Sequence, residues 1–83
     1  MDIRKVMGVN ARRFRNALDL SQESVAERMG ADRAYVSAIE RGIQNLTLLR
    51  LRELAEALGV RAADLLDEAY AAQVLVHGKE AGS

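Results

Sequence analysis

This 83-residue chain has many charged and hydrogen-bonding side chains that could do chemistry. They lack the pairing of a histidine with a nucleophile that catalysis often requires. The sequence has no cysteine, its one histidine is His77 near the end of the chain, and it has no glycine-rich phosphate loop and no metal-ligand spacing. A lone histidine beside a polar tail is a poor candidate for a ligand or a general base. The sequence therefore predicts a protein that is not an enzyme and that uses no metal, no cofactor and no small-molecule substrate.

The most informative polar residues lie in one stretch, LSQESVAERMGADRAYVSAIERG, which begins at residue 20. Ser21 and Asp32 are good N-cap residues, because their side-chain oxygens can accept hydrogen bonds from free backbone N–H groups of a first helical turn. Gly30 lies between them and allows the left-handed conformation that ends a helix abruptly. Two short helices are therefore predicted on either side of a tight turn.

The second of these helices leaves one face free of any role in the core. Val36 and Ile39 are spaced to face the interior of the protein. The outer positions carry Arg33, Ala34, Tyr35, Ser37 and Ala38. A helix that is buried on one side and polar with low relief on the other suits the major groove of DNA. The stretch predicts a helix-turn-helix.

The rest of the chain is predicted to form the helices that hold this corner. Five helical segments are expected, at about 3–18, 21–29 and 33–41, from the Thr47 cap to Leu58, and from Ala62 through Ala69. Apolar residues recur at helical spacing at Met7, Ala11, Phe14 and Leu18 in the first segment and at Leu48, Leu51, Leu54, Ala55 and Leu58 in the fourth. Because there is no proline and alternating β-branched runs are nearly absent, the predicted fold class is all-α. Residues 70–77 fit either a continued helix or a short strand.

Composition and charge narrow the class of protein. A hydrophobic fraction of 49% with an aromatic fraction of 4% indicates one aliphatic domain, near the lower size limit for a self-sufficient core. No apolar run is long enough for a membrane span or a signal peptide, so a cytoplasmic protein is expected. Net charge is zero, yet residues 1–52 hold ten Lys/Arg against six Asp/Glu, while residues 53–83 hold two against six. The basic part favours a polyanionic partner.

Residues 8–66 resemble the Cro/C1-type (XRE-like) helix-turn-helix DNA-binding family, and the run RAYVSAIERGIQNLTL is similar to controller proteins of restriction–modification systems. The matching residues are Gly8, Arg12, Arg15, Leu20, Ser21, Gln22, Val25, Ala26, Gly30, Val36, Ile39, Glu40, Gly42, Asn45, Leu58, Gly59, Val60, Leu65 and Leu66. The resemblance implies a five-helix, lambda-repressor-like domain, which we place over residues 1–69. The apolar residues that remain beyond the core and the polar end of the chain predict a C-terminal dimerisation extension and flexible tail over residues 70–83. Where the family usually has glycine before Leu-Ser-Gln this chain has Asp19, so some backbone strain is expected there.

The resemblance also implies roles for individual residues. The residues expected to contact DNA bases are Asp32, Arg33, Ala34, Tyr35, Ser37 and Ala38. The residues expected to contact DNA phosphates are Gln22, Arg41 and Asn45. Arg15 and Glu40 match a pair that forms a buried salt bridge between the first helix and the end of the third.

Three of these residues have a second interpretation. Asp32 fits a helix cap better than a base contact, because a carboxylate near phosphates must be paired or aimed at a cytosine amino group. Tyr35 fits either packing on the helix surface or contact with a thymine methyl or a phosphate. Arg33 could be an ordinary solvated side chain, although the helix dipole disfavours a cation at a helix start.

The sequence as a whole predicts a sequence-specific DNA-binding transcriptional regulator that acts as a homodimer on a palindromic operator. Its expected partners are double-stranded DNA and a second copy of the chain, and no membrane is expected. The apolar residues expected to form the dimer interface are Leu65, Leu66, Ala69, Tyr70, Val74 and Val76. The alternative is a non-catalytic protein-interaction adaptor that keeps the fold without specific DNA binding, which the zero net charge favours.

Overall fold

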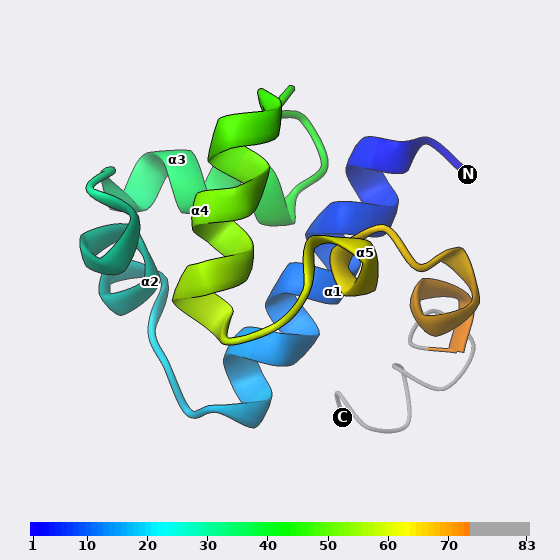
Figure 1. The fold of residues 1–83 in the computed structure, drawn as a ribbon, viewed down its shortest axis with the longest axis horizontal. Coiled ribbons are helices and arrows are strands. Elements are labelled where there is room, and N and C mark those ends of the chain that lie inside the picture. Colours follow the sequence, from blue (N-terminus) through cyan, green and yellow to red (C-terminus); the bar gives the residue numbers. More distant parts are fainter. Residues whose placement is uncertain (74–83) are drawn as a thin grey trace.

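The computed structural model describes residues 1–73, and this part of the chain is helical without any strand. The helices are α1 (Ile3–Ala17), α2 (Gln22–Met29), α3 (Arg33–Glu40), α4 (Leu48–Leu58) and α5 (Ala62–Leu65). Residues 68–73 form a further helical segment. The short helices α2 and α3 meet at a corner beside the longer α1 and α4, while α5 lies against α1 (Figure 1). The predicted all-α, five-helix fold with a central helix-turn-helix is confirmed.

The helices begin where their capping side chains predict. The side-chain oxygens of Asp2, Ser21, Asp32 and Thr47 accept hydrogen bonds from the backbone N–H groups two or three residues later, at 2.8 to 3.1 Å. At the other ends of α2 and α4, Gly30 and Gly59 both take a φ of +67°. The left-handed glycine lets the last carbonyls of each helix find backbone donors, which stops the helix sharply.

One apolar cluster holds the five helices together. The side chains that are less than 6% exposed include Met7, Ala11, Val25, Ala26, Met29, Val36, Ile39, Leu54, Ala55, Leu58 and Leu65. Two leucines predicted on the apolar faces are exposed instead, Leu18 at 49% and Leu48 at 85%. Leu18 is the C-cap of α1 and Leu48 is the first residue of α4, so both lie beyond the turns that contact the core.

A buried asparagine fixes α5 against α1. Asn10 is fully buried, and its Nδ2 lies 3.3, 3.0 and 3.0 Å from the carbonyl oxygens of Asp64, Leu65 and Asp67. Because α5 has only four residues, its carbonyls have few partners within the helix, and the amide supplies donors for them. This orientation leaves Asn10 Oδ1 buried without a partner among residues 1–73. Burying an unpaired amide oxygen costs free energy, so the hydrogen bonds that Nδ2 donates must stabilise the fold by more than that cost.

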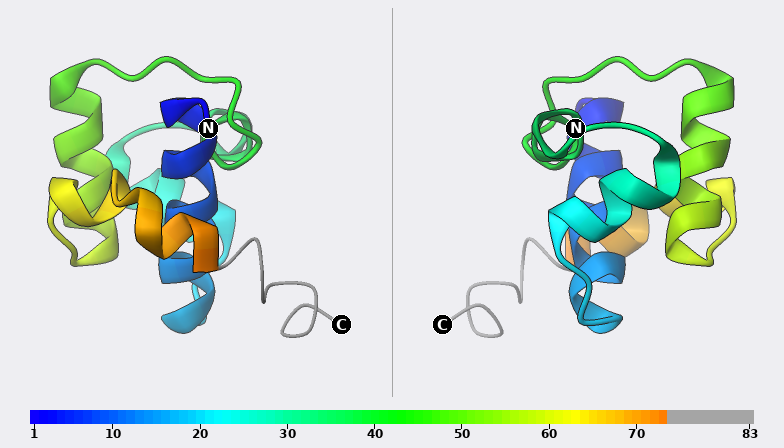
Figure 2. Two further views of the ribbon diagram at one scale, coloured as in Figure 1. Left: turned by 90° about the vertical axis from the view of Figure 1, so that its right-hand side faces the viewer. Right: turned by 90° about the vertical axis from the view of Figure 1, so that its left-hand side faces the viewer.

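The helical segment 68–73 packs back onto α1 (Figure 2). The ring of Tyr70 stacks on Phe14 with centroids 5.1 Å apart and an interplanar angle of 14°, and the Arg13 guanidinium lies 4.2 Å from the Tyr70 centroid. Ala71 is fully buried in the same contact. The predicted fifth helix from Ala62 through Ala69 is therefore divided, because α5 ends at the Leu66 cap and the chain becomes helical again only over residues 68–73. The choice between helix and strand for residues 74–77 lies outside the described residues.

The turn before α2 carries the expected departure from ordinary backbone geometry. Asp19 has a φ of +55°, and it is the one non-glycine residue with positive φ in the described part of the chain. Asp tolerates this left-handed conformation better than most residues, although glycine would adopt it without a steric cost. The strain predicted at this position is therefore present in the backbone.

Helices α1 and α3 approach each other most closely at Gly8. A Cβ atom at this residue would lie 2.5 Å from the carbonyl oxygen of Ile39 and 2.8 Å from that of Glu40. These are backbone atoms at the end of α3, so they cannot rotate away as a side chain could. The crossing of the two helices therefore requires glycine.

We expect Gly8→Ala to destabilise the domain by about 1–3 kcal/mol, because the added methyl pushes α3 away from α1. The clash therefore costs more free energy than the roughly 1 kcal/mol that a change from glycine to alanine gains in helix propensity at an open site. Urea denaturation followed by circular dichroism measures the free energy of unfolding. The exposed α1 residue Asn16 gives the control, since Asn16→Ala gains propensity without a clash. A Gly8→Ala protein as stable as wild type would contradict the close crossing.

Candidate nucleic-acid interface

The corner between α2 and α3 is held from inside by small and apolar side chains. Ala26 and Val36 are 2% and 1% exposed, so the two helices meet without a large side chain between them. The N–H of Ala31 donates to the carbonyl oxygen of Ala26 at 2.9 Å, which closes the turn after Gly30. The inner face of α3 is thereby fixed, and its other face points away from the core.

The residues predicted to contact DNA differ in exposure. Asp32, Arg33, Ala34, Arg41 and Asn45 are exposed, whereas Gln22, Tyr35, Ser37 and Ala38 are half-buried. The structure gathers the base-contact candidates on α3 and places Gln22 beside the end of that helix. It places Asn45 elsewhere, in the loop after α3, where it lines a shallow cleft with Ile3 and Arg4.

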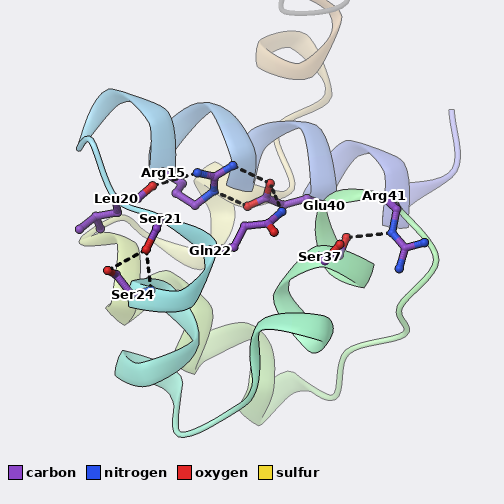
Figure 3. A network of polar contacts seen from close by, with 8 residues as sticks. All are labelled: Arg15, Leu20, Ser21, Gln22, Ser24, Ser37, Glu40 and Arg41. Atoms are coloured by element: carbon purple, nitrogen blue, oxygen red, sulfur yellow. Dashed lines mark hydrogen bonds and ion pairs between the residues drawn. The ribbon is translucent and has the colours of Figure 1, made fainter.

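A buried ion pair connects α1 to the end of α3 (Figure 3). Arg15 Nε donates to Glu40 Oε2 at 2.6 Å and Arg15 Nη2 donates to Glu40 Oε1 at 3.0 Å. The two side chains are only 14% and 6% exposed, and the hydrogen bonds that Arg15 donates to Glu40 raise the pKa of Arg15 above its ordinary value. Arg15 therefore stays charged, and the pair that the resemblance implied is present.

The same network extends into the turn and into α2. Arg15 Nη1 donates to the carbonyl oxygen of Leu20 at 2.9 Å, just before α2 begins. Gln22 Nε2 donates to Glu40 Oε1 at 3.2 Å. A carboxylate can only accept hydrogen bonds, so this contact fixes which end of the Gln22 amide faces Glu40. No local pattern predicts this hydrogen bond, because it joins residues 18 positions apart.

The side chains at the far end of α3 are less restrained. Arg41 Nε lies 3.4 Å from the carbonyl oxygen of Ser37, a long distance for a hydrogen bond (Figure 3). The Arg41 guanidinium is exposed to solvent. It is therefore loosely tethered and able to reach an anion beyond the helix end.

Tyr35 packs against the protein rather than standing clear of it. Its ring is half-buried against the apolar cluster, and the guanidinium of Arg50 from α4 lies 5.3 Å from the ring centroid. Burial raises the pKa of the Tyr35 phenol, while the charge of Arg50 lowers it and that of Glu53 raises it. Of the two interpretations of Tyr35, the structure shows the packing of its ring on the protein surface. Sequence reasoning missed Arg50, because no local pattern links it to α3.

The residues predicted to form a dimer interface do not all reach the surface. Leu65 is fully buried in the core, so its assignment to the interface is wrong. The amphipathic pattern of α5 does not distinguish which of two adjacent leucines faces inward. Leu66 is 36% exposed and Ala69 is exposed, whereas Tyr70 stacks within its own chain. Val74 and Val76 lie outside the described residues.

Residues 1–73 contain neither a membrane-spanning helix nor a cluster of metal ligands. No helix in this range is long and apolar enough to cross a bilayer. No group of three His, Asp or Glu side chains in the same range is arranged to hold a metal ion.

We expect Glu40→Ala to cost on the order of 3–5 kcal/mol, because it leaves the Arg15 charge buried without its partner. This is a large share of the stability of a small domain, so the thermal midpoint should fall sharply. Arg15→Met combined with Glu40→Leu should recover much of the loss, although the Leu20 carbonyl then loses a donor. Thermal melts followed by circular dichroism measure all three proteins.

The control for this prediction is an exposed pair on α4. Arg52 and Glu56 are 3.1 Å apart, with side chains 77% and 66% exposed. Glu56→Ala should therefore change stability by no more than about 1 kcal/mol. If the melt of Glu40→Ala overlays that of Glu56→Ala, the Arg15–Glu40 pair contributes no more than a surface contact.

Comparison with known proteins agrees with this architecture. The sequence model of the family described as Helix-turn-helix matches residues 12–65. An uncharacterized HTH-type transcriptional regulator, y4dJ of Sinorhizobium fredii, is 46% identical over 80% of this chain and 86% of its own length. Control protein C.SmaI of Serratia marcescens is 42% identical over 80% of this chain and 79% of its own. The crystal structure of the restriction-modification controller protein C.AhdI of Aeromonas hydrophila superposes with a TM-score of 0.71 at 39% identity, covering 75% of this chain and 90% of that one.

The predicted likeness to restriction–modification controller proteins is thus confirmed by two of these relatives. The matched range contains the corner between α2 and α3 together with the buried ion pair that supports it. The chain belongs to the helix-turn-helix family.

Proposed function

We propose that this protein is a sequence-specific DNA-binding transcriptional regulator that inserts α3 into the major groove. The observation that carries the proposal is the division of α3 into two faces. Val36 and Ile39 are buried against α1 and α2, whereas Arg33 and Ala34 in the first turn are exposed. The names of the relatives, an HTH-type transcriptional regulator and two controller proteins, support the same function.

In this proposal the outer face of α3 meets the base edges. The base contacts are assigned to Asp32, Arg33, Ala34, Tyr35, Ser37 and Ala38. Asp32 Oδ1 already accepts the N–H of Tyr35 at 2.9 Å, so a base contact from Asp32 would use its other carboxylate oxygen. Arg33 is the strongest candidate, because a cation at a helix start is unfavourable until an acceptor such as guanine or a phosphate approaches it.

The phosphate contacts are assigned to Gln22, Arg41 and Asn45. The hydrogen bond from Gln22 Nε2 to Glu40 holds the Gln22 amide in place before DNA arrives. A group that is already oriented loses less side-chain entropy on binding. Gln22 thus steadies the position of α3 on the DNA backbone, and the exposed Arg41 and Asn45 would contact phosphates flanking the groove.

We expect Arg33→Ala to weaken binding to the selected DNA by roughly 1–3 kcal/mol while leaving the fold intact. Fragments of genomic DNA that the protein retains are sequenced first, and fluorescence anisotropy then measures affinity for the enriched site. Arg52→Ala is the control, because it removes the same charge from an exposed arginine on α4. Equal affinities of Arg33→Ala and Arg52→Ala would show that Arg33 reads no base.

The salt dependence of binding separates the regulator from an adaptor that keeps the fold without specific DNA binding. For a true DNA-binding protein the log of the affinity falls with log salt, with a slope of about −0.9 per phosphate contact. Failure to enrich any DNA fragment, together with no salt-dependent binding, would favour the adaptor.

We also propose that the protein acts as a homodimer on a palindromic operator. One helix-turn-helix covers one half-site, and two half-sites lie about 34 Å apart on DNA. The interface would use Leu66 and Ala69, which are exposed, and Leu66 adjoins Ile3, which is 50% exposed. Burial of these side chains against a second copy would remove exposed apolar surface from water.

We expect Leu66→Glu to give a folded monomer that binds a palindromic site at least about a hundredfold more weakly, since the two half-sites then lose their linkage. Its binding to a single half-site should change little. Leu18→Glu is the matched control, because Leu18 is an exposed leucine at the far end of α1. Sedimentation velocity at tens of micromolar decides the oligomeric state, and a Leu66→Glu protein that still dimerises would place the interface elsewhere.

A further inference from the structure

One arginine outside the helix-turn-helix touches the helix-turn-helix at two points. Arg50 lies in the first turn of α4, and its Nη1 donates to the carbonyl oxygen of Met29, the last residue of α2, at 3.2 Å. The Arg50 Cζ atom also lies 5.3 Å from the ring centroid of Tyr35 on α3. Nη1 makes a further contact of 3.2 Å with Glu53 Oε1 on its own helix. One planar group therefore contacts both helices of the corner.

The contact with Met29 fixes where the guanidinium lies. A carbonyl in the last turn of a helix lacks a partner within the helix and carries the negative end of the helix dipole. A cation that donates to this carbonyl is stabilised there. With Nη1 held by Met29 and Glu53, the plane of the Arg50 guanidinium remains beside the ring of Tyr35.

The contact with Tyr35 matters because of how the helices pack. Helix α3 packs mainly on α1 and α2, and α4 packs mainly on α2. The Tyr35 backbone is fixed by the hydrogen bond from its N–H to Asp32. Its ring, by contrast, is only half-buried, and Arg50 lies against it. A cation within about 6 Å of an aromatic ring attracts it, so Arg50 restrains a side chain that the core alone does not enclose.

We propose that Arg50 is a positioning residue for DNA recognition, which holds the ring of Tyr35 in the one rotamer that meets the DNA. The inference rests on the proposed function, because it concerns the α3 face assigned to the bases. Arg50 acts through Tyr35, and the contribution of Tyr35 to affinity depends on Arg50.

The size of the effect follows from rotamer populations. A side chain has three staggered wells for its first torsion angle, and the apparent affinity falls in proportion to the fraction in the competent one. Because Tyr35 lies on a helix, the well at about +60° clashes with the preceding turn, which leaves two accessible wells. If removal of Arg50 lets the ring occupy these two wells about equally, the competent fraction falls to about one half, and the expected loss of affinity is about twofold.

A double-mutant cycle on the enriched DNA site tests this dependence. Arg50→Ala, Tyr35→Ala and the double variant are measured by anisotropy at one salt concentration, well below their thermal midpoints. Arg50→Ala should lose about twofold more affinity than Arg52→Ala, which removes an equal charge from the same helix without touching α3. In the Tyr35→Ala background, Arg50→Ala should lose no more than Arg52→Ala does. Arg50→Lys keeps the charge but lacks the planar group that reaches Met29, Glu53 and Tyr35 together, so it should not restore wild-type affinity.

A second readout examines the ring without DNA. The chain has two tyrosines, Tyr35 and Tyr70, so selective labelling gives two sets of NMR signals, and Tyr70→Phe assigns them. The three-bond couplings of Tyr35 should report one dominant rotamer in the wild type and in Arg52→Ala, and an average over rotamers in Arg50→Ala. A loss of stability alone would not change the rotamer in the folded protein.

The outcomes separate this inference from the function on which it rests. Additive losses in the cycle with an unchanged Tyr35 rotamer, or full affinity in Arg50→Lys, would show that Arg50 contributes only its charge and would overturn the inference. Failure of the wild type to enrich any DNA would overturn the proposed function and this inference with it. Coupled losses together with rotamer averaging support it.

Discussion

The ion pair between Arg15 and Glu40 is the interaction on which the arrangement of the helices depends. It is nearly enclosed by protein, so it can persist only because each charged group is satisfied, Arg15 by Glu40 and the Leu20 carbonyl and Glu40 by Arg15 and Gln22. These partners belong to α1, to the turn before α2, to α2 itself and to the end of α3. A rotation of any one of these elements would leave a buried charge unpaired. The pair therefore fixes the angle at which α3 is presented, beyond what apolar packing alone would specify.

The constraint at Gly8 complements this pair. The ion pair restrains direction, whereas the bare Cα of Gly8 permits the short distance between α1 and the last carbonyls of α3. Together they hold the C-terminal end of α3 against α1, while Arg50 of α4 contacts the ring of Tyr35 near the N-terminal end of α3. The helix that is proposed to read DNA is thus supported at both ends by residues that are not themselves on its outer face.

Much of this fold was predictable because its determinants are local in sequence. Ser21, Asp32 and Thr47 cap helices within three residues, and Gly30 ends α2 where a left-handed glycine is expected. The determinants that sequence reasoning missed are contacts between distant segments. The amide of Asn10, the guanidinium of Arg50 and the burial of Leu65 rather than Leu66 depend on which elements meet, which no periodicity encodes. In the candidate site, the resemblance supplied the Arg15–Glu40 pair, but not the hydrogen bond that joins Gln22 to it.

The contact of Asn10 with α5 also bears on the order in which the domain can assemble. Its amide bonds carbonyl groups 54 to 57 residues further along the chain, whereas α1, α2 and α3 follow one another closely. Closing so long a loop carries an entropic cost that contacts between neighbouring helices do not, so docking of α5 belongs to a late stage of folding. During synthesis the ribosome must release the chain past Asp67 before the amide reaches its acceptors. Until then Asn10 is hydrated, and the surface of α1 that later receives α5 remains in contact with water.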